Sequence, residues 1–586
     1  MRAVRGSLAL GAVVFAIYAL GACPTIYVGD SGELVTAVDR LGIPHPTGYP
    51  LYVLAGKLWT LVLPFGSVAW RMSLFSAACA AVAVGGLHHL CRRLGAGSVA
   101  SLVAALLFAA SPSLWGEANV QRVYALNALF VVAATHAAVT WRDRRDTASL
   151  ARAFFLCGLG ATNHAFMAVY AAVLGAWAVA TGGPGTRRPV PLAAAAGAFV
   201  LGLLPYLYLP VRSRAHPVLD WGDPETMRAF AAVVTRRNFW QRAWVEQPGD
   251  LWTIARDYVA SFPIELGWGG VALVLVGAGV AWRRQAPLAL FVLLMLANLA
   301  SVALHGSRAD VFVWHRYYVP SYALAAIVAA LGCEVLVTAL PRALRAAPLL
   351  LPLVALVARW PEFDRSRYRI AEDFGLAVLG ALPPGAHLVA TDDNVLFALM
   401  YLHFVEGRRP DVDLVLQGIG GPVPPAMRFD PEGERLFFTH HPNWKVPGLE
   451  IVPMGLVFEA RRPGPHPAPL ATPDVLAGED DPRVPKDYLT QNLLGHFHYM
   501  RGVTAAATSW PDGARELERA AAAAPENDVL FYNLALVYRR SGHWNEALQA
   551  ARRSQAINPR HLATAGRPRA ADLAAEIDRE RPREAR

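Results

Sequence analysis

Two carboxylates, Asp30 and Glu33, follow an apolar run, Gly6 to Val28, that is long enough to cross a bilayer. An ionisable pair at a membrane boundary is costly to desolvate, so it is a functional candidate by default. A carboxylate half out of water has a raised pKa, which suits proton transfer near neutral pH, so Asp30 is the predicted general base. Glu33 lies one helical turn further along. It is predicted to orient Asp30 or bind an acceptor, and the alternative is an ordinary carboxylate at a helix start.

The segment after these carboxylates combines Pro and Gly at a density that forces an irregular backbone. Its order, D-S-G-E, then about eight residues, then G-I-x-H-P-x-G-Y-P-L, resembles the opening signature of a membrane family long known only as a domain of unknown function. That family includes an animal protein O-mannosyltransferase and is similar to the fold-C (GT-C) glycosyltransferases. The resemblance extends over roughly residues 27–420.

The resemblance implies a chemistry for this first loop. GT-C enzymes take sugars from polyprenyl-phosphate carriers and keep an acidic residue in the first non-cytoplasmic loop, which corresponds here to Asp30. His45 is then predicted either to donate to the phosphate or to lock the turn by bonding backbone. Tyr49 is predicted either to line the sugar site or to anchor the chain at the membrane interface.

Further polar residues lie at the ends of other apolar runs. The stretch W-x-E-x-x-x-x-R-V-Y-x-L-N resembles the family pattern E-x-Y-x-L-N, but the family's glutamate falls at Arg122. Either Glu117 replaces it or the acid is not essential. A T-N-H motif lies at a break in apolar sequence, where polar groups also satisfy freed backbone. For the cations near span ends, snorkelling is the alternative to phosphate binding. The predicted substrate-binding residues, besides His45 and Tyr49, are Glu117, Arg122, Tyr124, Asn127, Asn163, His164, Arg212, His315 and Arg316.

Composition indicates a polytopic membrane protein with a soluble part. Of 586 residues, 54% are hydrophobic and only 17% charged, which is less charge than a soluble protein of this size carries. The net charge of +9 does not indicate nucleic-acid binding, because the arginines cluster in short loops between apolar runs. No motif has metal-ligand spacing, and no cofactor is predicted apart from a lipid-linked sugar as co-substrate.

Apolar runs near twenty residues long predict about eleven crossings. The first is 6–28. Residues 154–179 form a crossing broken at the T-N-H motif, and later runs include 264–282 and 349–357. All short Arg-rich loops then fall on one side, including those at Arg187 and Arg284, so the N-terminus is predicted to be cytoplasmic and Asp30 to face the other way. High Ala, Arg and Gly content favours a GC-rich bacterium, with an inner-membrane location and a periplasmic C-terminal part.

The soluble part is predicted to contain two folded regions. A strand at 386–391, a helix at 395–406 and a strand at 412–417 indicate a small α/β domain. Beyond a Pro-rich linker, Phe531, Leu534, Tyr538 and Pro559 match diagnostic positions of a tetratricopeptide repeat. A looser repeat precedes it, and the tail after Ala570 is expected to form a capping helix. The predicted domains are 1–360 (GT-C-like), 361–459 (α/β), 460–487 (linker) and 488–586 (repeats).

These observations favour an inverting glycosyltransferase in the bilayer. It would transfer a sugar, mannose by family analogy, from a polyprenyl-phosphate carrier to a protein Ser or Thr hydroxyl on the non-cytoplasmic side, with the repeats engaging the acceptor. The alternatives are a lipid or glycan acceptor, or a non-enzymatic membrane scaffold or glycolipid transporter. A transporter should show internal repeats and polar groups at mid-membrane depth, and neither is evident in the sequence.

Overall fold

The computed structural model describes residues 2–582 except 187, 243–244, 246, 284–286, 306–314, 418–434, 443–447, 466–467 and 560–567. Arg187 and Arg284, two of the predicted cytoplasmic arginines, therefore lie outside the described residues. The chain divides into two units. The first contains Met1–Tyr27 and Glu33–Tyr368, and the second contains Val28–Gly32 and most of the chain from Arg369 onward.

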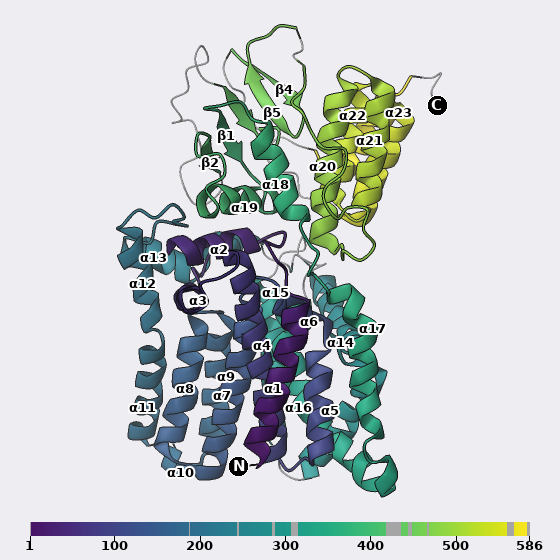
Figure 1. Ribbon diagram of the computed structural model, residues 1–586. Helices are drawn as coiled ribbons and strands as arrows, with labels where there is room; N and C mark the ends of the chain where they lie inside the picture. The colour runs from purple at the N-terminus through teal and green to yellow at the C-terminus, as the bar shows by residue number, and fades with distance from the viewer. Residues whose placement is uncertain are drawn as a thin grey trace. The chain divides into compact units, whose positions relative to one another are not determined.

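The first unit is a bundle of apolar helices (Figure 1), as a multi-pass membrane protein requires. Within the described residues six helices are long and apolar enough to cross a membrane, and one bent pair, 98–109 with 112–118, would make a seventh. Shorter apolar helices accompany them, so the expected eleven crossings stay a prediction. The helices are α1 (Arg2–Leu20), α2 (Ser31–Arg40), α3 (Pro50–Val62), α4 (Val68–Arg93), α5 (Ser98–Ala109), α6 (Pro112–Ala118), α7 (Tyr124–Arg144), α8 (Thr147–Ala161), α9 (Phe166–Thr181), α10 (Gly183–Thr186), α11 (Pro189–Gly202), α12 (Tyr208–Ser213), α13 (Met227–Val234), α14 (Pro248–Arg283), α15 (Leu288–His305), α16 (Val319–Ala339) and α17 (Leu350–Phe363).

The helix bounds differ from the expected apolar runs at two places. Helix α1 ends at Leu20 although the apolar run continues to Val28, because Gly21 and Pro24 interrupt the helix and the side chain of Asn119, just after α6, donates to the carbonyl of Gly21. Helix α14 begins at Pro248, well before the expected start of the crossing at Ile264, and its helical backbone is interrupted at Gly267, whose φ is 70°. By contrast, the break expected at the T-N-H motif is confirmed, since it separates α8 from α9.

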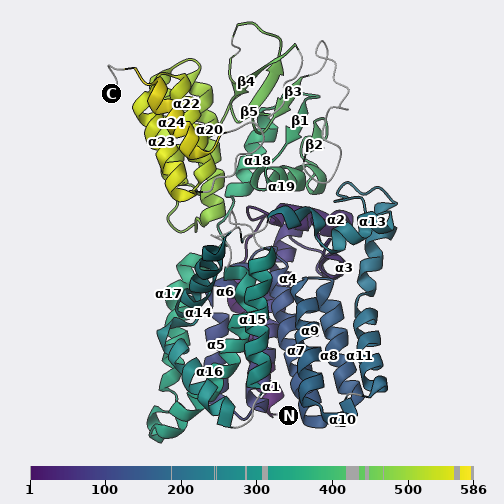
Figure 2. The same ribbon diagram turned by 180° about the vertical axis from the view of Figure 1, so that it is seen from behind.

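The two ends of the helical unit differ in the residues and helices that form them. Arg93 at the end of α4 pairs with Asp143 near the end of α7 at 2.8 Å, so two Arg-rich helix ends meet. The N-terminus and α10 lie at this end in Figure 1, whereas α2, α3, α12 and α13 lie at the opposite end. Figure 2 shows the same arrangement from behind, with α8 next to α11 in both views. Most of the predicted site residues belong to elements at the α2–α3 end.

The second unit combines a mixed sheet with a helical array. The strand–helix–strand unit expected after residue 386 is confirmed: β1 (His387–Ala390) pairs in parallel with β2 (Asp413–Leu416), and α19 (Asp393–Met400) connects them. The strand order is β2-β1-β3-β5-β4, and β5 runs antiparallel to both neighbours. The remaining elements are β3 (Leu436–Phe438), β4 (Glu450–Met454), β5 (Val457–Arg461), α18 (Ile370–Ala381), α20 (Tyr488–Ala506), α21 (Trp510–Ala523), α22 (Asp528–Arg540), α23 (Trp544–Ile557) and α24 (Ala570–Glu580).

Helices α20 to α24 pack each on the next around a core that includes Leu517, Leu534 and Ile577. Helix α24 forms where a capping helix was expected. The assignment of these helices to the tetratricopeptide family stays a prediction. The array contacts the sheet region directly, since Thr504 of α20 donates to the carbonyl of Gly455 at 3.0 Å.

A buried ion cluster fastens the segment before α20 to the array. The imidazole of His498 is 2% exposed and lies between Glu479, at 2.6 Å, and Glu516, at 2.8 Å. Burial opposes ionisation of both glutamates, but hydrogen bonds from His498 and the charges of neighbouring arginines together lower the pKa of each. Ionised carboxylates therefore stabilise this region.

We expect His498→Leu to lower the local opening free energy of α20 and α21 by about 2 kcal/mol, because it removes the hydrogen bonds of His498 to two partly buried carboxylates, which keep Arg501 and Arg519 as ion-pair partners. Hydrogen exchange on the full-length protein measures this quantity. Since the pKa values of both glutamates are lowered, their contribution is present above the ordinary carboxyl pKa of about 4.3 and is lost as the pH falls below it. The control is Arg515→Ala, which removes an exposed pair with Asp512 and should leave the protection of both helices nearly unchanged. Equal protection in both variants would contradict the prediction.

Candidate active site

The first loop places its two carboxylates in different surroundings. Asp30 directly precedes α2 and is partly buried. Glu33 lies in the first turn of α2, and its side chain has no exposed surface. A carboxylate removed from water in this way needs hydrogen-bond donors.

His45 supplies those donors. Its ring Nδ1 lies 2.5 Å from Glu33 Oε2, and its backbone N–H donates to Glu33 Oε1 at 2.8 Å. Its other ring nitrogen, Nε2, lies 2.9 Å from the hydroxyl of Tyr49. A neutral imidazole satisfies all three groups when Nδ1–H donates to Glu33 and Nε2 accepts from Tyr49. The structure thus brings three predicted site residues together in one chain of hydrogen bonds and engages both ring nitrogens of His45.

The backbone between His45 and α3 depends on a left-handed turn. Gly48 has φ of 80° and Tyr49 has φ of 40°, just before α3 begins at Pro50. A Cβ atom on Gly48 would approach Leu209 Cδ2 to 2.8 Å. The left-handed conformation therefore favours glycine here, and the end of the Leu209 side chain would have to move to admit a Cβ atom.

We expect Gly48→Ala to reduce stability by about 2 kcal/mol or more, since left-handed strain and overlap with Leu209 add together. Thermal unfolding of the detergent-solubilised protein checks this. Gly183→Ala is the matched control, because Gly183 also has a positive φ, of 70°, but a Cβ atom added there would have no neighbour within 4 Å. If both variants lose the same stability, contact with Leu209 does not matter.

A distant segment holds this turn in place. Ile43 donates its N–H to the carbonyl of Leu219 at 2.7 Å and accepts from the N–H of Trp221 at 3.0 Å. The indole of Trp221 then lies edge-on to His45, with ring centroids 6.2 Å apart. The predicted phosphate ligand Arg212 instead donates to the carbonyls of Arg40 and Leu41, so it fixes the end of α2.

A second group of predicted residues surrounds Arg316. Its guanidinium lies 3.7 Å from Glu117 and stacks over the rings of Tyr124, at 5.5 Å, and Tyr317, at 5.9 Å. Both members of the ion pair are largely buried, with Arg316 11% and Glu117 14% exposed. A cation held by a carboxylate and two aromatic faces is preorganised to meet a further anion.

His164 closes this group on the side of the α8–α9 break. Its ring centroid lies 5.7 Å from that of Tyr124, and its Nδ1 accepts from the N–H of Phe166 at 3.3 Å. Because Nδ1 accepts, the ring is the neutral tautomer that carries its proton on Nε2. His164 can therefore donate one hydrogen bond to a ligand but brings no charge.

Two buried amides lie near the same break. The side chain of Asn163 donates to the carbonyl of Val123 at 3.2 Å, and Asn127 lies one helical turn after Val123. Among the described residues, neither amide oxygen has a hydrogen-bond partner. Buried polar atoms are rarely left unpaired, so these two oxygens are candidates to receive hydroxyl groups of a ligand.

The start of α3 connects the two groups. The N–H of Leu51 donates to the carbonyl of Thr162 at 3.4 Å, directly before the last two T-N-H residues. One residue later, the buried hydroxyl of Tyr52 interacts electrostatically with Arg122 and Glu117. Arg122 itself is 2% exposed. The first turn of α3 therefore contacts the segment that carries Asn163 and His164.

His315 belongs to a different polar group, which sequence reasoning missed. Its Nε2 lies 3.3 Å from Asp257 and its Nδ1 lies 3.9 Å from Glu265. Glu265 is buried in α14 and accepts from the N–H of Ser113 at 3.0 Å, from the Ser113 hydroxyl at 2.5 Å and from the Ser111 hydroxyl. A single glutamate inside the apolar run 264–282 was the available signal. Among the residues that the structure describes, no three His, Cys, Asp or Glu side chains are grouped to hold a metal ion.

Comparisons with known proteins confirm the resemblance expected from the sequence. Residues 30–183 match the family model "Protein O-mannosyl-transferase TMEM260 N-terminal domain". The chain is 30% identical over 447 residues to the mouse protein O-mannosyl-transferase TMEM260, covering 71% of this chain and 63% of the mouse protein. It is 24% identical over 455 residues to the Dictyostelium discoideum tmem260 protein, covering 68% of this chain and 55% of that protein. The chain thus spans less than two thirds of each relative's length.

Solved structures share the fold. ArnT from Cupriavidus metallidurans in the apo state aligns with a TM-score of 0.50 at 13% identity, over 77% of this chain and 97% of ArnT. ArnT bound to undecaprenyl phosphate aligns with a TM-score of 0.50 at 14% identity, over 74% of this chain and 92% of ArnT. At this identity the likeness concerns the fold alone, which is of the GT-C type.

Proposed function

Because residues 30–183 match the TMEM260 N-terminal domain model and the chain is 30% identical to the mouse relative, we propose that it belongs to that membrane family and is a membrane glycosyltransferase. It transfers a sugar, mannose, from a polyprenyl-phosphate carrier to a protein Ser or Thr hydroxyl. The reaction takes place on the non-cytoplasmic side of an inner membrane, and the N-terminus and the Arg-rich end of the bundle are cytoplasmic. The name of the mouse relative supports the sugar and acceptor, and the carrier bound by ArnT supports the donor.

Asp30 is the general base of this proposal. It takes the proton of the acceptor hydroxyl while that oxygen attacks the anomeric carbon. The bond from this carbon to the phosphate oxygen breaks, and the polyprenyl phosphate leaves with the electron pair. Glu33 is saturated by His45 and fully buried, so it acts as a positioning residue that holds the turn.

Arg316 stabilises the leaving phosphate. Its guanidinium is already largely buried, so it loses little further solvation when negative charge grows on the phosphate oxygen. The buried amide oxygens of Asn127 and Asn163 receive sugar hydroxyls. Helices α20–α24 engage the acceptor protein, as helical repeat arrays bind extended peptides. The observation that carries the proposal is the hydrogen-bonded group of Glu33, His45 and Tyr49, which lies inside the family-matched segment and begins three residues after Asp30.

Comparative glycoproteomics tests the function. Cells lacking the gene should lose hexose from Ser or Thr residues of a set of exported proteins, and the wild-type gene should restore it. A variant carrying Asp30→Asn should not restore it. Unchanged hexose occupancy on all exported proteins, together with unchanged consumption of lipid-linked sugar, would overturn the proposal and favour a scaffold.

A further inference from the structure

A groove between α1 and α4 lies outside the candidate active site. Its cavity volume is about 580 Å³, and small residues such as Gly11, Ala12, Ala78 and Gly86 form much of its lining. The two helices run close together beside it, since a Cβ atom on Gly85 would lie 2.8 Å from the carbonyl oxygen of Ser7. Lipid-facing side chains flank it, with Leu8 70% and Val82 57% exposed.

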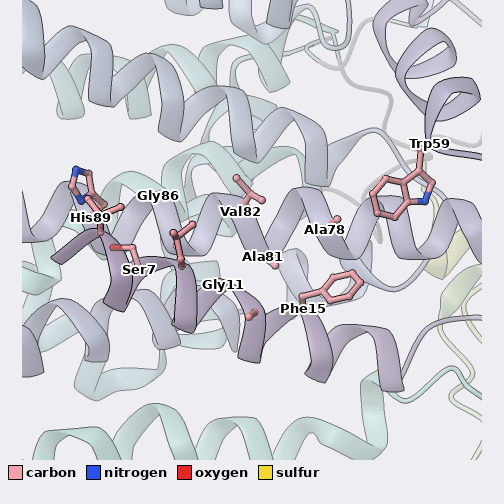
Figure 3. A pocket seen from close by; sticks show the side chains of 13 residues that line it. Ser7, Gly11, Phe15, Trp59, Ala78, Ala81, Val82, Gly86 and His89 are labelled. Atoms are coloured by element: carbon pink, nitrogen blue, oxygen red, sulfur yellow. The ribbon is translucent and has the colours of Figure 1, made fainter. Parts of the chain in front are cut away.

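The two ends of the groove have different chemistry (Figure 3). Phe15 and Trp59 lie at one end, and Ser7 and His89 lie at the other. Nδ1 of His89 is buried and has no hydrogen-bond partner among the described residues. The groove is apolar over almost all of its lining, and the imidazole of His89 marks the end near Ser7 as its polar end.

Positive charge gathers at the polar end. Arg5 is exposed and follows the lining residue Val4, and Arg92 lies one turn beyond His89 on α4. This is the Arg-rich end of the bundle, where Arg93 pairs with Asp143. An anionic group at the polar end would thus meet cations.

The length of the groove matches one leaflet. From Val4 to Phe15 the helix rises about 16 Å at about 1.5 Å per residue, roughly half of the ~30 Å hydrocarbon core. A chain entering from the Arg-rich end would therefore end near mid-membrane. The residues proposed for catalysis belong to elements at the opposite end of the bundle, so a donor with its sugar at Asp30 would not place its phosphate here.

We propose that this groove binds one acyl chain of an anionic phospholipid from the leaflet at the Arg-rich end, with the headgroup phosphate near Arg5 and His89. The proposal does not depend on the proposed reaction. A bound phospholipid would fill the space beside the α1–α4 contact and fasten α1 to the bundle.

Native mass spectrometry of the full-length protein in detergent, titrated with dioleoylphosphatidylglycerol, tests the site. Ala12→Leu fills the groove and should weaken binding of the tightest lipid about tenfold, equivalent to about 1.4 kcal/mol. Val13→Leu is the matched control, because Val13 is the next residue, is 57% exposed and does not line the groove. It should bind as the wild type does.

A second arm tests the headgroup. The wild type should prefer phosphatidylglycerol to phosphatidylcholine with the same chains, and Arg5→Gln should reduce that preference. Equal binding by Ala12→Leu and the wild type would overturn the site, and equal binding of the two lipids would overturn the anionic headgroup. Displacement of phosphatidylglycerol from the wild type by equimolar undecaprenyl phosphate would assign the groove to the carrier lipid and overturn the proposed occupant.

Discussion

Asp30→Asn is expected to reduce sugar transfer about 10²- to 10⁴-fold, because the amide keeps the size of the carboxylate but cannot accept the acceptor's proton. Purified protein in proteoliposomes, supplied with polyprenyl-phosphate mannose and an acceptor protein, provides the assay. Membrane insertion should be unchanged, since asparagine has nearly the same size and shape as aspartate. The loss should appear in the transfer step, with little change in donor binding.

A nearby carboxylate is the control for this variant. Asp39 is partly exposed and lies 3.8 Å from Lys57, near the end of α2. Asp39→Asn removes one negative charge, as Asp30→Asn does, and should change transfer less than about twofold. Full activity of Asp30→Asn, or equal losses in both variants, would show that Asp30 is not the base.

Arg316→Met is expected to lower transfer about 10²- to 10³-fold, as does removal of other preorganised groups that stabilise developing negative charge. Methionine keeps the packing against Tyr124 and Tyr317 but removes the cation. Arg316→Lys should recover part of the activity, because it restores charge without the planar fork. The assay is the same, with donor concentration varied to separate kcat from KM.

Arg214→Met is the matched control for Arg316, since Arg214 is exposed in the same helical unit. It should behave as the wild type. A purely structural role for Arg316 predicts a lower unfolding temperature with normal transfer in the surviving protein. That outcome would contradict the assigned contact with phosphate.

The sequence was sufficient for features that depend on local pattern. Alternation and turn residues predicted β1, α19 and β2, and the polar T-N-H motif predicted the break between α8 and α9. The end of α1 was also readable from local pattern but was missed, because residues 21–28 remain mostly apolar although Gly21 and Pro24 are helix-stop signals. The start of α14 at Pro248 was also missed. Its first turns carry charged residues, so a search for apolar runs passes over them although they are helical.

The sequence predicted which residues belong to the candidate site, but it did not predict which of them contact each other. Glu33 and His45 were each singled out, yet their hydrogen bond depends on a left-handed turn at Gly48 and on the attachment of Ile43 to Leu219. The turn is a backbone conformation and the attachment is a long-range contact, and neither can be read from the spacing of residues in the sequence. The group around Glu265 was missed because its hydrogen-bond donors, Ser111 and Ser113, lie at the start of α6, far away in the sequence.

The most direct test of the proposed sugar transfer follows the sugar of the lipid-linked donor. Purified protein in proteoliposomes is given polyprenyl-phosphate mannose carrying a labelled sugar, and lipid-bound and protein-bound label are measured over time. We expect label to leave the lipid, to appear on Ser or Thr of the acceptor, and to leave one polyprenyl phosphate for each sugar transferred. Retention of all label on the lipid, in the presence of an acceptor that native membranes do modify, would contradict it.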